Sequence, residues 1–292
     1  MAAVLALLIA GVPWFMHRLG TDRAAADPRA PTPTAEQTSQ FTPSAVPSQS
    51  SDAVDLSAAF AELSTGLSAD IGLAYAPVGA EGRVTTLGTW SSGPAWSTIK
   101  VPLALALLRQ DGTQSVSGAM RSAITASDNG AAQSMWDELG AHQGAADKVQ
   151  SILAEAGDPT PLVPSEVTRP GFSAFGQTLW PLSDQVRFLA RAACDPRDAP
   201  VLDLMGEVVS GQRWGLGTID GSRFKGGWGP GTDGLYLVRQ YGIVDTPEGH
   251  TVVALAAVPD SGGFGDGTAV LNRMAAWLQE HLGEIGGGRC GS

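Results

Sequence analysis

Residues 95–108 read AWSTIKVPLALALL, which joins a short polar stretch to a long apolar run. The run has the length and composition of a buried helix, and we expect a helix over 97–110. Ser97 and Lys100 are three residues apart, so they share one face of that helix. The first turn of a helix carries a positive partial charge, which disfavours a lysine ammonium. The chain has only three lysines, at 100, 148 and 225, so this placement argues against a purely structural role.

A lysine in this position has a chemical use. Burial and nearby positive charge both favour its neutral form, and a neutral amine at Lys100 could accept the proton of Ser97. Pro102 requires that the helix begin close to it or be locally distorted, and the sequence leaves both open. By itself Ser-x-x-Lys is a weak motif, and the alternative is a capping serine beside an exposed lysine.

Elements on both sides of this stretch indicate an α+β fold. A helix is expected from 55 onward, followed by strands at 71–75 and 83–90. The sequence from 97 to 213 is mostly helical in pattern. It contains a long proline-rich loop at 158–181, and a loop of that length inside a compact domain usually has a function. Strands return at 223–228, 234–244 and 250–258, and a helix covers 266–282. We therefore predict an antiparallel sheet of about five strands, flanked by the N- and C-terminal helices, with an inserted all-helical lobe.

The N-terminal residues are predicted to lie outside this domain, which spans 55–285. Residues 1–26 contain a short apolar run typical of a signal peptide or signal anchor. Residues 27–54 are rich in Pro, Ser and Thr and predict a disordered tether. We expect an exported protein, secreted or held at the membrane only through its N-terminal segment.

Charge and cysteine content narrow the function classes. The net charge of −11 and the absence of a basic run argue against nucleic-acid binding. The four histidines are scattered, so no metal and no cofactor is expected. Cys194 and Cys290 favour one disulfide in an exported protein, and two unpaired thiols are the alternative.

Two further motifs change the weight of Ser-x-x-Lys. Ser127-Asp128-Asn129 lies between two predicted helices, where a helix cap is the ordinary interpretation. Lys225-Gly226-Gly227 lies on the first strand after the helical lobe, where the glycines alone would indicate a strand end. In this order, the three motifs are the active-site set of class A β-lactamases and penicillin-binding proteins. The sequence resembles that superfamily over roughly residues 56–283.

The resemblance implies a role for each matching residue. Ser97 would be the acylated nucleophile, Lys100 its general base and Ser127 the proton donor to the leaving nitrogen. Lys225 would support Ser127 and attract an anionic substrate. Backbone N–H groups of Ser97 and Trp228 would form the oxyanion hole. The substrate would be bound by Asn129, Gly226 and Gly227.

The chain departs from the family pattern in three places. Gly226 stands where the family carries a Thr or Ser that binds the substrate carboxylate; Arg239 could supply the missing charge, although a surface cation is its more ordinary interpretation. Glu166 is a weak candidate for the deacylation base, because the Leu-Asn that follows in class A enzymes is absent. Only 30 positions separate Ser97 from Ser127, which predicts a trimmed helical lobe.

These observations predict a monomeric serine hydrolase that acts on a small molecule through a Ser97 ester. A β-lactam or related amide is the first choice of substrate. A D,D-peptidase acting on peptidoglycan is the second, and a catalytically weakened cell-wall binding module is the third.

Overall fold

The computed structural model describes residues 54–79 and 83–291, and all the described residues belong to a unit that begins at Ser51. The segments expected to form a signal or anchor (1–26) and nearly all of the tether (27–54) lie outside the described residues. Within the described ranges, no helix combines the length and the apolar character needed to cross a membrane.

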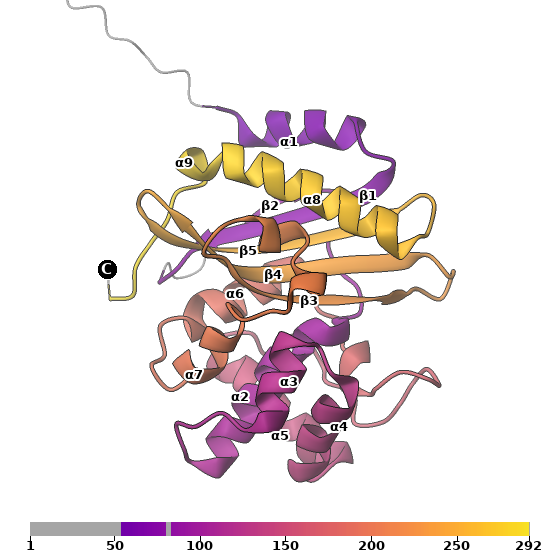
Figure 1. Ribbon diagram of the computed structural model, residues 1–292, viewed down its shortest axis with the longest axis vertical. Helices are drawn as coiled ribbons and strands as arrows, with labels where there is room; N and C mark the ends of the chain where they lie inside the picture. Colours follow the sequence, from indigo (N-terminus) through magenta and orange to yellow (C-terminus); the bar gives the residue numbers. More distant parts are fainter. Residues whose placement is uncertain (1–53, 80–82, 292) are drawn as a thin grey trace, which may run out of the picture. The chain divides into compact units, whose positions relative to one another are not determined.

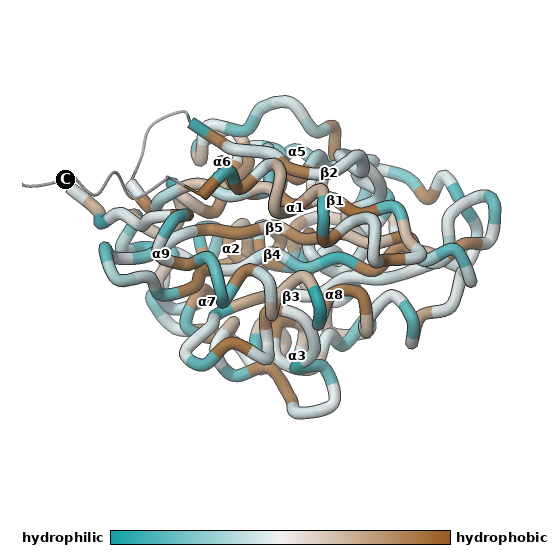
Figure 2. The backbone as a smooth tube through the Cα atoms, turned by 90° about the horizontal axis from the view of Figure 1, so that it is seen from above, coloured by the Kyte–Doolittle hydropathy of each residue, from teal (hydrophilic) through white to brown (hydrophobic). Residues whose placement is uncertain are grey.

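A five-stranded antiparallel sheet forms the centre, as predicted from the sequence. The strands occur in the order β2-β1-β5-β4-β3 and are β1 (Ala69–Pro77), β2 (Thr85–Gly88), β3 (Arg223–Pro230), β4 (Tyr236–Thr246) and β5 (Gly249–Pro259). The middle strand β5 is apolar along much of its length (Figure 2), because helices cover both of its faces. Strand β3 is an edge strand, and the short turn Trp96–Ile99 packs beside it.

The first and last helices cover one face of this sheet (Figure 1). Helix α1 (Leu56–Thr65) begins where the Asp55 carboxylate accepts the backbone N–H groups of Ser57 and Ala58 at 3.0 and 3.2 Å. Helix α8 (Phe264–Glu280) packs against β4 and β5, with Leu271 and Met274 fully buried between them, and α9 (Leu282–Ile285) follows it. This layer keeps the sheet rigid behind the edge strand.

The opposite face carries the helical lobe, which occupies the chain between β2 and β3 (Figure 1). Helix α2 (Lys100–Asp111) runs through its interior, and every residue from Lys100 to Leu108 is buried. The other helices of the lobe are α3 (Gly118–Thr125), α4 (Asn129–Glu138), α5 (His142–Glu155), α6 (Leu182–Ala192) and α7 (Ala199–Leu204). The lobe thus presents the N-terminal end of α2 to the sheet.

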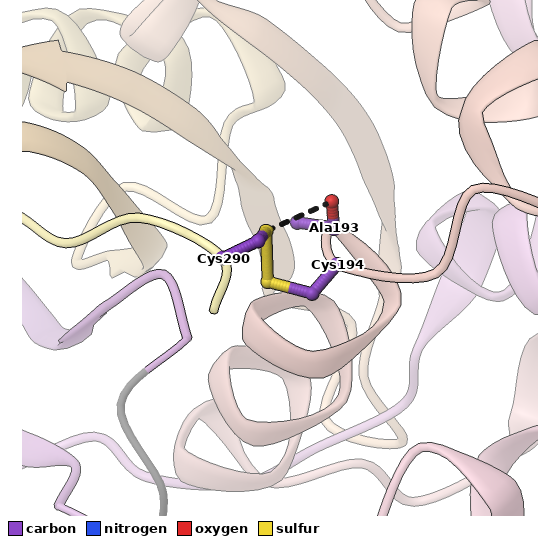
Figure 3. The surroundings of a disulfide bond; sticks show 3 residues. All are labelled: Ala193, Cys194 and Cys290. Carbon is purple, nitrogen blue, oxygen red and sulfur yellow. Dashed lines mark hydrogen bonds between the residues drawn. A yellow bond between two sulfur atoms is a disulfide. The ribbon is translucent and has the colours of Figure 1, made fainter. Parts of the chain in front are cut away.

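A disulfide bond joins the C-terminal segment to the end of α6 (Figure 3). Cys194 and Cys290 lie 5.2 Å apart between their Cα atoms, across 96 positions of sequence. Of the two alternatives that the cysteines left open, the bridge is the one observed. It closes the chain on the side of α6, and neither sulfur contacts the residues of the three motifs.

Candidate active site

The nucleophile candidate lies on a tight turn immediately before α2. Residues Trp96–Ile99 form a 3-10 helix, and the α-helical turns begin at Lys100. Pro102 therefore lies in the first α-helical turn, where its missing N–H breaks no hydrogen bond. The helix begins close to Pro102, which is one of the two arrangements that the sequence left open.

Two non-glycine residues of this region have positive φ angles. Trp96, directly before Ser97, has φ 50°, and Ser127 has φ 58°. Such a conformation costs about 1–3 kcal/mol and persists only where the surroundings enforce it. Both strained residues adjoin or carry a hydroxyl of the motif set, which is the distribution expected of a functional site.

A buried hydrogen-bond chain holds the Ser97 turn from beneath. The Thr98 hydroxyl donates to Ala95 O at 2.6 Å and accepts from Gln185 Nε2 at 2.8 Å. Gln185 in turn accepts from Arg239 Nη2 at 2.6 Å, and Arg239 also donates to the carbonyls of Gly93, Pro94 and Trp180. The turn is thereby tied to α6 and to β4.

Arg239 consequently has neither of the roles considered for it from the sequence. Its side chain is fully buried, so it is not a surface cation, and four buried oxygens occupy its guanidinium, so it does not face a substrate. Burial lowers its pKa to about 9. The strand pattern could not reveal this, because the arginine sits on an inward-facing position normally occupied by an apolar residue.

Lys100 reaches the Ser127 motif from the first residue of α2. Its Nζ donates to Ser127 O at 2.6 Å, to Asn129 Oδ1 at 2.7 Å and to Asp128 O at 3.3 Å. Burial lowers the pKa of Lys100 from 10.5 to about 8, and the charge of Asp128 partly opposes this shift. Among the described residues, Lys100 Nζ has no hydrogen bond to the Ser97 hydroxyl in this state.

Lys225 approaches the same serine from the edge strand β3. Its Nζ contacts Ser127 Oγ at 2.8 Å and Gly226 O at 2.9 Å. Burial lowers the pKa of Lys225 well below its usual value, and the positive charge of Lys100 lowers it further. The amine of residue 225 therefore points into the cluster, and Ser127 connects both lysines.

Strand β3 passes very close to the Ser97 turn. A Cβ at Gly227 would lie 2.9 Å from Ser97 N and 2.8 Å from Ala95 O, so only glycine fits there. This contact places the backbone of β3 beside Ser97, with Trp228 as the next residue. The two N–H groups expected to form an oxyanion hole thus belong to neighbouring backbone segments.

Gly226 faces the other side of β3, where tryptophan occupies the space. A Cβ at Gly226 would lie 3.3 Å from the Trp214 ring. Trp214 packs against Trp228 with ring centroids 5.9 Å apart, and both contact Phe264 at the start of α8. An aromatic cluster therefore lies next to the position that a side chain at residue 226 would occupy.

Glu166 is not brought into the centre. Its carboxylate lies 2.8 Å from His142 Nδ1, and both side chains are more than 70 % exposed. Among the described residues, neither lysine nor Ser127 is hydrogen-bonded to it. This placement gives a role in deacylation no support.

Sequence reasoning missed three contributors to the site: the strained Trp96, the Gln185–Arg239 clamp and the Phe264 edge of the aromatic cluster. Trp96 alone had a signal in the sequence, since it precedes the nucleophile candidate. The other contacts join residues distant in sequence.

In the described ranges, no group of His, Cys, Asp or Glu side chains could hold a metal ion.

Solved structures confirm the expected fold. The chain superposes on the TLA-3 extended-spectrum β-lactamase with a TM-score of 0.61 at 17% identity, over 77% of this chain and 98% of that one. A representative class A β-lactamase from Bacteroides cellulosilyticus gives 0.61 at 15%, over 76% and 95% of the two chains. A β-lactamase from Streptosporangium roseum gives 0.58 at 16%, over 78% and 98%.

No family model matches the sequence, and no curated protein matches it either. The three solved structures nevertheless confirm the class A β-lactamase fold that the motifs suggested. Their sequence identity to this chain is too low to transfer an activity.

Proposed function

We propose that this chain is a serine hydrolase that transfers acyl groups through an ester of Ser97. The observation that carries the proposal is the convergence of both buried lysines on Ser127, beside the Ser97 turn. Burying two amines is costly, and a structural role would be filled better by apolar side chains. A reaction that needs a neutral amine explains the cost.

The proposed chemistry assigns a role to each group. Ser97 Oγ attacks the acyl carbon while Lys100, in its neutral form, takes the serine proton. The tetrahedral oxyanion is stabilised by the N–H groups of Ser97 and Trp228. Ser127, hydrogen-bonded to Lys225, passes a proton to the leaving group. Water then hydrolyses the Ser97 ester.

A β-lactam or related amide is the first substrate class that we propose, and a peptidoglycan peptide is the second. The exposed position of Glu166 favours slow hydrolysis of the acyl-enzyme, as in a penicillin-binding protein, over rapid turnover. A weakened binding module is disfavoured because the chain keeps all five side chains to which the resemblance gives a role: Ser97, Lys100, Ser127, Asn129 and Lys225. We also propose, from the sequence, that the protein is exported, that it is a monomer, and that residues 1–26 act as its signal peptide or anchor.

The test is covalent labelling of the purified protein. Two reagents are used: a fluorophosphonate probe, which reacts with activated serines, and benzylpenicillin. Each should form one covalent adduct per protein molecule, seen by intact mass and located on the peptide that contains Ser97. Ser97→Ala should abolish both adducts. Ser151→Ala, on the exposed side of α5, is the matched control and should label normally. Failure of the fluorophosphonate to label Ser97 would contradict the proposal.

A further inference from the structure

The edge of β3 beside Ser97 lacks the hydroxyl that would bind a carboxylate. Gly226 has no side chain, and a Cβ there would lie 3.3 Å from the Trp214 ring. A threonine would therefore require this indole to shift by a few tenths of an ångström. The substitution at 226 and the tryptophan at 214 therefore form one steric unit.

No described arginine around β3 is free to replace the hydroxyl. The arginines that border the strand all have other partners: Arg239 on Gly93, Pro94, Trp180 and Gln185, Arg169 on Pro230 O at 2.9 Å, Arg213 over the Phe224 ring at 5.6 Å, and Arg223 near Asp203 at 3.9 Å. Lys225 is buried, and its Nζ already contacts Ser127 Oγ at 2.8 Å and Gly226 O at 2.9 Å. An anionic group at this edge would therefore find no described cation without another partner.

Aromatic rings line this edge instead. Trp214 and Trp228 are half-buried, Phe264 is 36% exposed, and the Trp228 and Phe264 rings are 5.3 Å apart. Tyr236 extends the row at 6.2 Å from Phe264. We call these four residues the aromatic wall. Partly exposed rings of this kind bind apolar and aromatic groups and give an anion no compensation for its lost hydration.

We infer that the site accepts acyl donors whose leaving group is uncharged and apolar, such as an aryl ester or a neutral amide, and that the aromatic wall holds that group. The inference rests on the proposed Ser97 hydrolase activity and names its substrate class. In the reaction, the Ser97 Oγ–acyl bond forms and the acyl–oxygen bond to the leaving group breaks. Lys100 takes the serine proton, and Ser127 delivers a proton to the departing oxygen, which leaves as a neutral alcohol. One water later hydrolyses the Ser97 ester and releases the carboxylic acid.

Two matched pairs of donors test this inference. In each pair a methyl ester masks the carboxylate on the leaving side: benzylpenicillin methyl ester against benzylpenicillin, and methyl 4-acetoxybenzoate against 4-acetoxybenzoate. We measure acylation by time-resolved intact mass and ester hydrolysis by initial rate, with the Ser97→Ala background subtracted. The neutral member should react at least about tenfold faster in both pairs, the size of effect that one lost polar contact produces.

Variants of the wall sharpen the test. The double variant Trp214→Ala/Gly226→Thr opens the space and introduces a hydroxyl. It should lower the ratio of the neutral donor's rate to the charged donor's rate by at least about fivefold. Phe264→Ser should slow the neutral members. Leu162→Ser, an 81% exposed apolar residue of the 158–181 loop, is the control and should leave the ratio unchanged. A thermal melt checks that the double variant is folded. If it is not folded, the rate ratios of the wild-type protein alone test the inference.

The outcomes separate the two levels of proposal. If the fluorophosphonate labels Ser97 but the charged member reacts equally fast or faster in either pair, the inference is overturned and the hydrolase proposal stands. The same holds if the neutral members show no Ser97-dependent reaction. If the fluorophosphonate does not label Ser97, the hydrolase proposal fails first.

Discussion

The centre of the site and the 158–181 loop are built in opposite ways. In the centre, Lys100 and Lys225 are about 1% exposed, and their amines donate to Ser127 O at 2.6 Å and contact Ser127 Oγ at 2.8 Å respectively. In the loop, Glu166 meets His142 at the surface and Leu162 is 81% exposed. Burial favours the neutral form of the two lysines, whereas water solvates the Glu166 carboxylate. The contrast supports the proposal that acylation would take place in the centre and not in the loop.

The largest effect on Ser97 labelling should come from removing the buried amine of Lys100. Lys100→Met should slow labelling of Ser97 by about 10³-fold, because general-base assistance of this kind contributes roughly 10²–10⁴-fold. Lys148→Met is the matched control, since Lys148 bonds to Gln110 and Leu139 O at 2.7 Å and lies outside the centre. Its labelling rate should be unchanged. Equal losses in both variants would contradict a special role for Lys100.

The clamp beneath the Ser97 turn should be the next most sensitive part. Arg239→Leu leaves Gln185 Oε1 and the carbonyls of Pro94 and Trp180 buried without a donor, and we expect a loss of about 3 kcal/mol in the free energy of unfolding. Urea denaturation measures it. Arg239→Lys should recover part of the stability but not the rate of labelling, because a single amine cannot span the four acceptors. Full labelling by a folded Arg239→Leu protein would show that the clamp does not position Ser97.

The pH dependence of labelling identifies which lysine is the base. Lys100 has a pKa lowered to about 8 by burial, so its neutral form increases as the pH rises. The labelling rate should climb about 100-fold between pH 6 and 9 and level off above 8, if the neutral amine is the reactive form. A flat profile over this range would show that Lys100 is not the base and would leave Lys225 as the other described amine of the site.

The smallest effect is expected in the loop. Glu166→Gln should change the release of the acyl group by less than about twofold, since an exposed carboxylate has no perturbed environment to make it a base. Mass spectrometry of the decaying adduct measures this rate, and His142→Gln, which removes its surface partner, should behave alike. A tenfold slower release in Glu166→Gln would mean that the loop closes over the site during the reaction.

Local patterns in the sequence were enough to predict much of this protein. Alternating apolar residues predicted strands, the apolar run after Ser97 predicted α2, and three short motifs in a fixed order predicted the superfamily fold. These signals succeed because strand pairing and helix burial depend on the spacing of apolar residues within one segment. The cysteine pair was also correctly favoured as a bridge, although residue spacing could not prove it.

Only the tertiary structure decided what surrounds the three motifs. Arg239 is a buried clamp because β4 packs against α6. Gly226 faces Trp214 because the segment before β3 folds back over the strand, and Glu166 stays at the surface because its loop turns toward α5. None of these contacts lies within a single helix or strand, so local apolar spacing could not predict them. Sequence determined which groups are available for the reaction, and packing between distant segments determined which of them are desolvated, and hence reactive.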